Sequence, residues 1–104
     1  MRMMVQMTIP AEAGNAAIKD GSLMTTIQSA LADLKAEAAY FCAFGGERNG
    51  FIVFDMKDTS EIPGIAERFF LAFNAKVNFY PVMNAADLAA SGPGIAKAVA
   101  AHGG

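Results

Sequence analysis

Apolar and polar side chains alternate over residues 2 to 9, which is the pattern of a β-strand with one buried face. One side of this strand carries Met3, Val5, Met7 and Ile9. Pro10 ends the pattern, because proline cannot donate a hydrogen bond to a neighbouring strand. The first predicted element is therefore a strand that stops before residue 10.

Two helical stretches are predicted next. Residues 11 to 19 suit the first, Asp20-Gly21-Ser22 supplies a turn, and Ser22 can cap a second stretch that begins at Leu23. Large aliphatic residues recur at helical spacing at Leu23, Ile27, Leu31 and Leu34. We expect this stripe to pack on the sheet.

A hairpin is predicted in the middle of the chain. Its strands run from Ala38 to Phe44 and from Phe51 to Lys57. The segment Gly45 to Gly50 joins them, and its glycines and asparagine tolerate positive φ angles.

A further helix and strand follow the hairpin. The segment Asp58-Thr59-Ser60 offers capping oxygens, and the helix ends near Asn74, a residue that accepts the left-handed conformation. The helix carries a buried stripe of Ile62, Ile65, Phe69 and Phe73. Ala75 to Met83 predict a fourth strand, in which Pro81 indicates a sheet edge or a bulge.

The C-terminal segment predicts short helical pieces. Asn84 can cap a turn through Leu88, Ser91 to Gly94 break it, and Ile95 to Ala101 form a small helix. The order β-α-β-β-α-β plus a C-terminal helix is the ferredoxin-like arrangement, in which an antiparallel four-stranded sheet carries both helices on one face. We expect one α+β domain over residues 1–104.

The residues on both sides of the predicted strands are largely apolar, so the pattern does not decide which sheet face packs on the helices. The set opposite the presumed helix side contains Met4, Tyr40, Cys42, Phe44, Ile52, Phe54, Met56, Tyr80 and Val82, interrupted mainly by Gln6, Thr8 and Asn78. A sheet that is apolar on both faces needs cover on both. The simplest cover is a second copy related by a two-fold axis, so we expect a homodimer.

Composition narrows the choice of partners. Apolar residues make up 54% of the chain and charged residues 17%, which is below the roughly 25% charge of typical soluble domains. The net charge of −2 excludes a basic surface for nucleic acid or anionic membranes. The lone Cys42 excludes an internal disulfide and fits a reducing compartment. With no long apolar run, a soluble cytoplasmic protein is the expectation.

The layout of the chain resembles the dimeric α/β-barrel superfamily of ferredoxin-like domains. Within it, Gly50 to Asp58, Ile62-Pro63 and Phe79 to Met83 are similar to small bacterial proteins that carry only uncharacterised-domain labels. The resemblance covers roughly residues 1 to 90 and implies that two sheets face each other across a dimer to enclose a barrel. Relatives include cofactor-independent monooxygenases of aromatic polyketides, muconolactone isomerase and haem-binding enzymes, so the fold does not select one chemistry.

The sequence contains no motif that predicts a cofactor or metal site. The only histidine, His102, lies in an Ala/Gly tail and is expected to be exposed, so no haem ligand or multi-histidine metal site is predicted. Cys42 has no cationic neighbour in sequence, and we expect a buried, inert thiol. Gly45-Gly46 is not followed by a helix and does not predict a phosphate loop. No cofactor is expected.

A polar minority on the strands remains as the candidate ligand site: Gln6, Tyr40, Asn78 and Tyr80. In an otherwise apolar cavity between or beside the sheets, such groups would orient a small apolar or aromatic ligand. The alternative is that they pair with one another across the dimer and bind nothing. Whether the protein is an enzyme stays open. The enzymatic reading is a cofactor-independent monooxygenase or isomerase of an aromatic or lactone substrate, with Tyr40, Asn78 or Tyr80 orienting an enolate or carbonyl.

Overall fold

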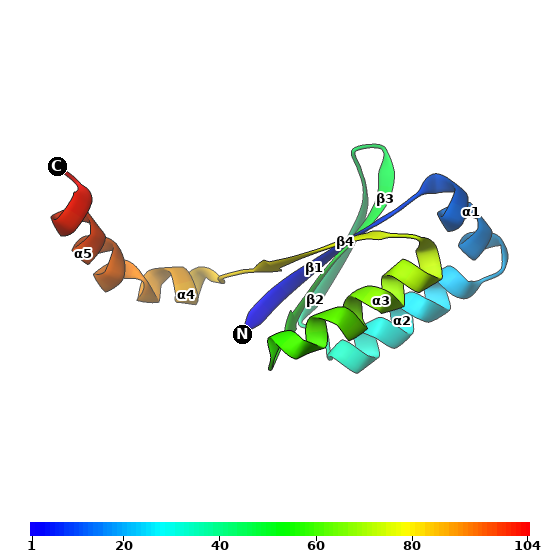
Figure 1. Ribbon diagram of the computed structural model, residues 1–104, viewed down its shortest axis with the longest axis horizontal. Coiled ribbons are helices and arrows are strands. Elements are labelled where there is room, and N and C mark those ends of the chain that lie inside the picture. Colours follow the sequence, from blue (N-terminus) through cyan, green and yellow to red (C-terminus); the bar gives the residue numbers. More distant parts are fainter.

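Four antiparallel strands form one sheet in the order β2-β3-β1-β4, and α2 and α3 lie together on one of its faces (Figure 1). The computed structural model describes residues 1–104. Its elements are β1 (Arg2–Ile9), α1 (Ala11–Lys19), α2 (Ser22–Leu34), β2 (Ala38–Phe44), β3 (Glu47–Asp55), the 3-10 turn η1 (Thr59–Glu61), α3 (Ile62–Phe73), β4 (Lys76–Pro81), α4 (Ala85–Ala90) and α5 (Gly92–His102). The predicted ferredoxin-like α+β fold is confirmed.

The core lies between the sheet and the helices. The sequence did not decide which sheet face packs on the helices, and in the structure it is the face that carries Val5. The buried strand residues on this face are Met3, Val5, Met7, Ile9, Ile52 and Phe54. The predicted stripe of α3 meets them through Phe69 and Phe73, which belong to the same buried cluster. The stripe of α2 packs against this cluster through Leu23, Leu31 and Leu34. Both stripes are therefore confirmed as the inner surfaces of their helices.

The grouping of Ile52, Phe54 and Met56 with the opposite sheet face is wrong. Ile52 pairs with Val5 and Phe54 with Met3, and directly paired residues point to the same side of a sheet. All three side chains are buried with the core. The open face instead receives Phe51 and Val53 from β3, since side chains alternate along a strand.

The hairpin between β2 and β3 is tighter than predicted. Strand β3 begins at Glu47 rather than Phe51, so only Gly45 and Gly46 form the connection, with φ angles of 63° and 79°. Two successive positive φ angles are those of the two-residue hairpin turn whose twist matches the strands. Arg48 and Asn49 look like loop residues in the sequence, yet they pair with Ala43 and Cys42.

Local capping follows the predicted pattern at α3 and differs at α2. The Asp58 carboxylate accepts the Ser60 amide at 2.8 Å, and the Asp58 amide donates to Glu61 at 2.8 Å. Asn74 ends α3 with a φ of 51°, as expected. Ser22 does not cap α2, because the carboxylate of Asp20 accepts the Ser22 amide at 2.8 Å and Gly21 precedes the helix.

Pro81 is the last residue of the edge strand β4, which confirms the prediction of a sheet edge. Beyond it, residues 82–104 form a segment that we call the C-terminal arm. The helix α5 of this arm begins at Gly92, earlier than the predicted Ile95, because Pro93 fits the first turn of a helix. No helix of the structure has both the length and the apolar character that crossing a membrane requires.

Candidate functional site

The four predicted site residues all lie on the open face of the sheet, opposite the helices. Tyr40, Phe51, Gln6 and Asn78 form one row across β2, β3, β1 and β4, as the strand register requires. Tyr80 lies in the neighbouring row, beside Met4. The structure therefore brings the predicted residues onto one surface, and a role for them in ligand binding or catalysis stays a prediction.

One of the four, Gln6, is already engaged within the chain. Its amide donates to Asn49 Oδ1 at 3.0 Å, and the hydroxyl of Thr8 donates to the same oxygen at 2.7 Å. The amide nitrogen of Asn49 donates to the carbonyl oxygens of Phe44 and Glu47, both at 3.1 Å. Asn49 is 4% exposed and fully hydrogen-bonded, so it joins the turn end of the hairpin to β1.

The β2 part of the open face is largely apolar and uncovered in the single chain. Tyr40 and Phe44 of β2 are 70% and 60% exposed, and the ring of Phe44 meets Phe51 edge-on with centroids 6.0 Å apart. Cys42 lies between them and is exposed, so the expectation of a buried thiol is wrong. The reason is that β2 is an edge strand and nothing in the chain covers this side of it.

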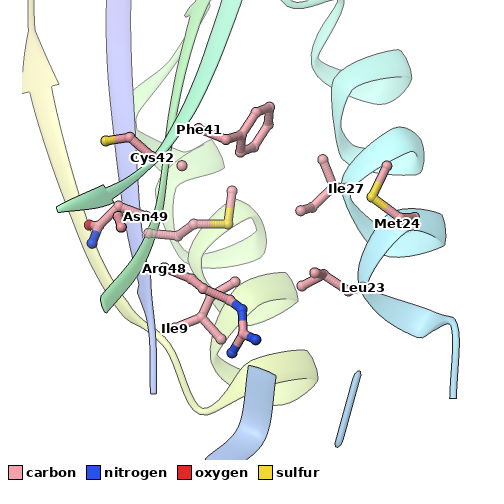
Figure 2. Close-up of a pocket in the computed structure, with 11 residues that line it drawn as sticks. Ile9, Leu23, Met24, Ile27, Phe41, Cys42, Arg48 and Asn49 are labelled. Carbon is pink, nitrogen blue, oxygen red and sulfur yellow. The ribbon is translucent and has the colours of Figure 1, made fainter. Parts of the chain in front are cut away.

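A separate cleft lies on the helix side, between α2 and the β2–β3 hairpin (Figure 2). It has a volume of about 350 Å³. Its lining is mostly apolar and comprises Met7, Ile9, Leu23, Met24, Ile27, Phe41, Cys42, Ala43, Arg48, Asn49 and Gly50. Figure 2 shows the ring of Phe41 pointing toward α2, while the sulfur of Cys42 and the amide of Asn49 point away from it.

The wall of the cleft depends on a residue without a side chain. A Cβ atom added to Gly50 would lie 2.9 Å from Cε1 of Phe41 and 3.2 Å from Cε of Met7. Glycine thus allows the Phe41 ring to lie against the backbone of β3. Across the gap, Met24 of α2 is 59% exposed, and Phe41 itself is 50% exposed. Sheet and helix therefore face each other here without filling the space between them.

One cation lines the cleft. Arg48 donates from Nη2 to Asn15 Oδ1 at 3.1 Å and from Nη1 to the carbonyl oxygen of Ala11 at 3.5 Å, both on α1. A Cβ atom on Gly14 would lie 2.6 Å from Arg48 Nη1, so this glycine makes room for the guanidinium. The ion pairs of the structure involve Arg2, Arg68, Lys57 and the Met1 ammonium, and no carboxylate pairs with Arg48.

A cluster of ionised groups lies at the opposite end of the sheet from Arg48. The Lys57 ammonium and the Met1 ammonium both bind the carboxylate of Asp55, which lowers the pKa of that carboxyl group to about 2. Asp55 pairs with Arg2 across β3 and β1, whereas Arg48 pairs with Ile9 at the far end of the same ladder. This charged cluster is therefore remote from the cleft. No group of three or more His, Cys, Asp or Glu side chains is placed to hold a metal ion.

The cleft was not anticipated from the sequence, although two signals for it are present. Gly50 inside a strand marks a close approach by another group, and the alternation of β2 puts Phe41 and Ala43 on the same side as Gly50. What the pattern does not carry is the distance between α2 and the hairpin. That distance decides whether the space is filled.

Comparisons with known proteins inform the fold. No known protein family matches the chain in sequence, and no curated protein matches it. Among solved structures, a formyltetrahydrofolate deformylase from Pseudomonas putida KT2440 superposes with a TM-score of 0.51 and 13% sequence identity. The match covers 79% of this chain and 29% of the deformylase, so the chain spans less than a third of that protein's length. At this identity the likeness shows a shared fold for the sheet and its helices.

Proposed function

We propose that this protein binds a small apolar or aromatic molecule in the cleft between α2 and the β2–β3 hairpin. The observation that carries the proposal is the cleft of about 350 Å³ with a mostly apolar lining. Ligand sites in proteins are concave, fall in this range of volume and are lined largely by apolar side chains with few polar groups. An occupant would remove the exposed parts of Phe41 and Met24 from water.

Arg48 gives the cleft a cationic group that can bind a polar end of the ligand. Its guanidinium lines the cleft and holds only neutral oxygen acceptors on α1, so an anionic group of a ligand would be its first charged partner. Hydrogen bonds between a cation and an anion are stronger than those to neutral acceptors. We therefore expect an aromatic or aliphatic body with one carboxylate or sulfonate to bind more tightly than its uncharged analogue.

The proposal includes self-association through the open face. This face carries exposed aromatic side chains, with half-buried Met4, Phe51 and Val53 between them. Together they form an apolar surface whose exposure to water is unfavourable. A second sheet related by a two-fold axis would cover it with the same residues. Because the cleft lies on the helix side of the sheet, such a dimer leaves both clefts free.

The ligand proposal is tested with two fluorescent probes of similar body. Anilinonaphthalene sulfonate carries an anionic group, and N-phenylnaphthylamine lacks it. Both are titrated into the purified protein and into two variants, Ala43→Phe, which adds a ring on the cleft side of β2, and Ala38→Phe, which adds the same ring on the open face. We expect saturable binding near one site per chain, weakened at least tenfold by Ala43→Phe and unchanged by Ala38→Phe.

The role of the Arg48 charge is tested with Arg48→Met, which keeps an unbranched apolar stem and removes the guanidinium. The affinity for the sulfonate probe is expected to fall at least fivefold while the affinity for the neutral probe holds. Equal loss for both probes would show that Arg48 acts through packing rather than charge. If Ala43→Phe and Ala38→Phe bind both probes as the unmodified protein does, the cleft is not the site and the proposal is wrong.

A further inference from the structure

The C-terminal arm, residues 82–104, projects from the sheet without a packing surface of its own. It runs away from α2 and α3 and ends far from the rest of the chain (Figure 1). Neither α4 nor α5 has a buried residue, and their substantial contacts are with each other. Helices of 6 and 11 residues are marginal in water when nothing packs against them. Their stability therefore calls for cover from outside this chain.

The side chains of the arm are typical of helices that pack against another surface. Leu88 of α4 and Ile95 and Val99 of α5 are 55%, 53% and 63% exposed. Ile95 and Val99 are four residues apart, so they lie on one face of α5. Asp87 and Lys97 are the only Asp, Glu, Lys or Arg residues in the arm. Surface helices in water normally carry charges over the face that points away from the core. The arm is too apolar for a segment that stays solvated.

The base of the arm is fixed in direction. The Val82 amide donates to the carbonyl oxygen of Arg2 at 3.1 Å, and Arg2 Nη1 lies 2.6 Å from Asp87 Oδ2. Asn84 and Asp87 form a reciprocal capping box that starts α4. These contacts aim the arm outward from the edge strand β4, so it cannot lie over the open face of its own sheet without breaking them.

The chain exposes more surface than a compact folded monomer of its mass. A folded monomer of 10.9 kDa is expected to expose about 5,600 Å². This chain exposes 6713 Å², and the excess of roughly 1,100 Å² is close to the area of about 800 Å² that each partner contributes to a standard interface. Its radius of gyration is 17.1 Å, against about 13 Å for a chain of this length folded as one body.

We propose that the C-terminal arm packs on a second copy of this chain, with Leu88, Ile95 and Val99 as its contact stripe. A second copy is the occupant because one two-fold association covers both unpartnered apolar surfaces of the chain, the open sheet face and the arm. Figure 1 shows the arm extending past the end of β4 and away from α2 and α3, where a second chain can reach it. The inference rests on the self-association proposed above and is independent of the ligand in the cleft.

The first experiment charges the stripe in the full-length chain and measures the dimer dissociation constant by sedimentation across a range of concentrations. The stripe variant carries three substitutions, Leu88→Glu, Ile95→Glu and Val99→Glu. A control variant receives the same charge at exposed positions away from the stripe, Ala86→Glu, Ala90→Glu and Ala101→Glu. Glutamate favours helix, so neither set breaks the backbone of the arm. We expect at least a hundredfold weaker dimer for the stripe variant and less than a threefold change for the control.

The second experiment detects the arm on its partner directly. An unlabelled copy with Cys42→Ser and Ala90→Cys carries a nitroxide on the arm and is mixed with an equal amount of isotope-labelled Cys42→Ser protein. Broadening of amide signals within residues 1–81 of the labelled copy supports the inference. Absence of such broadening overturns it.

The outcomes separate this inference from the proposal above. A stripe variant that dimerises as tightly as the unmodified chain overturns the arm contact and leaves a sheet-to-sheet dimer in place. An unmodified chain that stays monomeric at all concentrations overturns both kinds of self-association. Probe binding in the cleft is read separately, and neither result changes its interpretation.

Discussion

The ring of Phe41 lies so close to the backbone of Gly50 that a Cβ atom on Gly50 would be 2.9 Å from Cε1 of the ring. The two residues are in register on β2 and β3, so the glycine provides the space that the phenylalanine occupies. This pair sets one wall of the cleft. A change at Gly50 should therefore alter the cleft before it alters the fold.

Gly50→Ala is expected to push the Phe41 ring toward α2 and into the cleft. Because Phe41 is half-exposed, the ring can move, and the free energy of unfolding should fall by only about 1 kcal/mol. The affinity for anilinonaphthalene sulfonate should fall at least fivefold in a fluorescence titration. Gly64→Ala is the control, because a Cβ atom there meets no other atom within 4 Å. Unchanged probe affinity in Gly50→Ala would contradict this account of the wall.

Asn49 should carry much of the stability of the hairpin. Asn49→Ala leaves two backbone carbonyl oxygens without their donor and removes the acceptor of Gln6 and Thr8. Leaving buried polar groups unpaired is costly, and we expect a loss of about 2 kcal/mol in urea unfolding at one fixed protein concentration. Asn78→Ala, at an exposed position on β4, should change stability by less than about 0.5 kcal/mol. Similar losses for the two variants would disprove a special role for Asn49.

Asp55 should make the free energy of unfolding depend on pH in the acid range. The contacts with Lys57 and the Met1 ammonium lower its pKa in the folded chain from 3.8 to about 2, so between these values the unfolded chain binds more protons. Its contribution is therefore complete above the unfolded pKa and is lost as the pH falls through the folded pKa. Unfolding free energies of the unmodified chain and of Asp55→Asn should differ at pH 5 and converge near pH 2, with a smaller difference in high salt. Curves that stay parallel would rule out this linkage.

Tyr40 tests the sheet-to-sheet contact without disturbing the core. It is 70% exposed, so Tyr40→Glu should leave the unfolding of a monomeric chain nearly unchanged. Placed in an apolar interface, the added charge should raise the dimer dissociation constant at least tenfold in sedimentation experiments. Gln28→Glu adds the same charge on the exposed face of α2 and should have no effect. Equal dissociation constants for all three proteins would remove the open face from the interface.

The elements and their inner surfaces were predictable from the sequence because they depend on local periodicity. Phe69 and Phe73 recur at helical spacing, and Met3, Val5, Met7 and Ile9 recur at every second position, so each set indicates the inner side of its own helix or strand. The four polar candidates on the strands were likewise predictable as a group. The strand register then placed Tyr40, Gln6 and Asn78 in one row.

By itself, then, the sequence determined a ferredoxin-like order of elements and a sheet with two largely apolar faces. The tertiary structure alone decided that Ile52 and Phe54 face the helices, that Asn49 is buried in the hairpin, and that a cleft separates Phe41 from α2. Periodicity describes one element at a time, whereas a register, a buried amide and an unfilled gap depend on the distance between elements. That distance is set by how side chains from remote parts of the chain pack together.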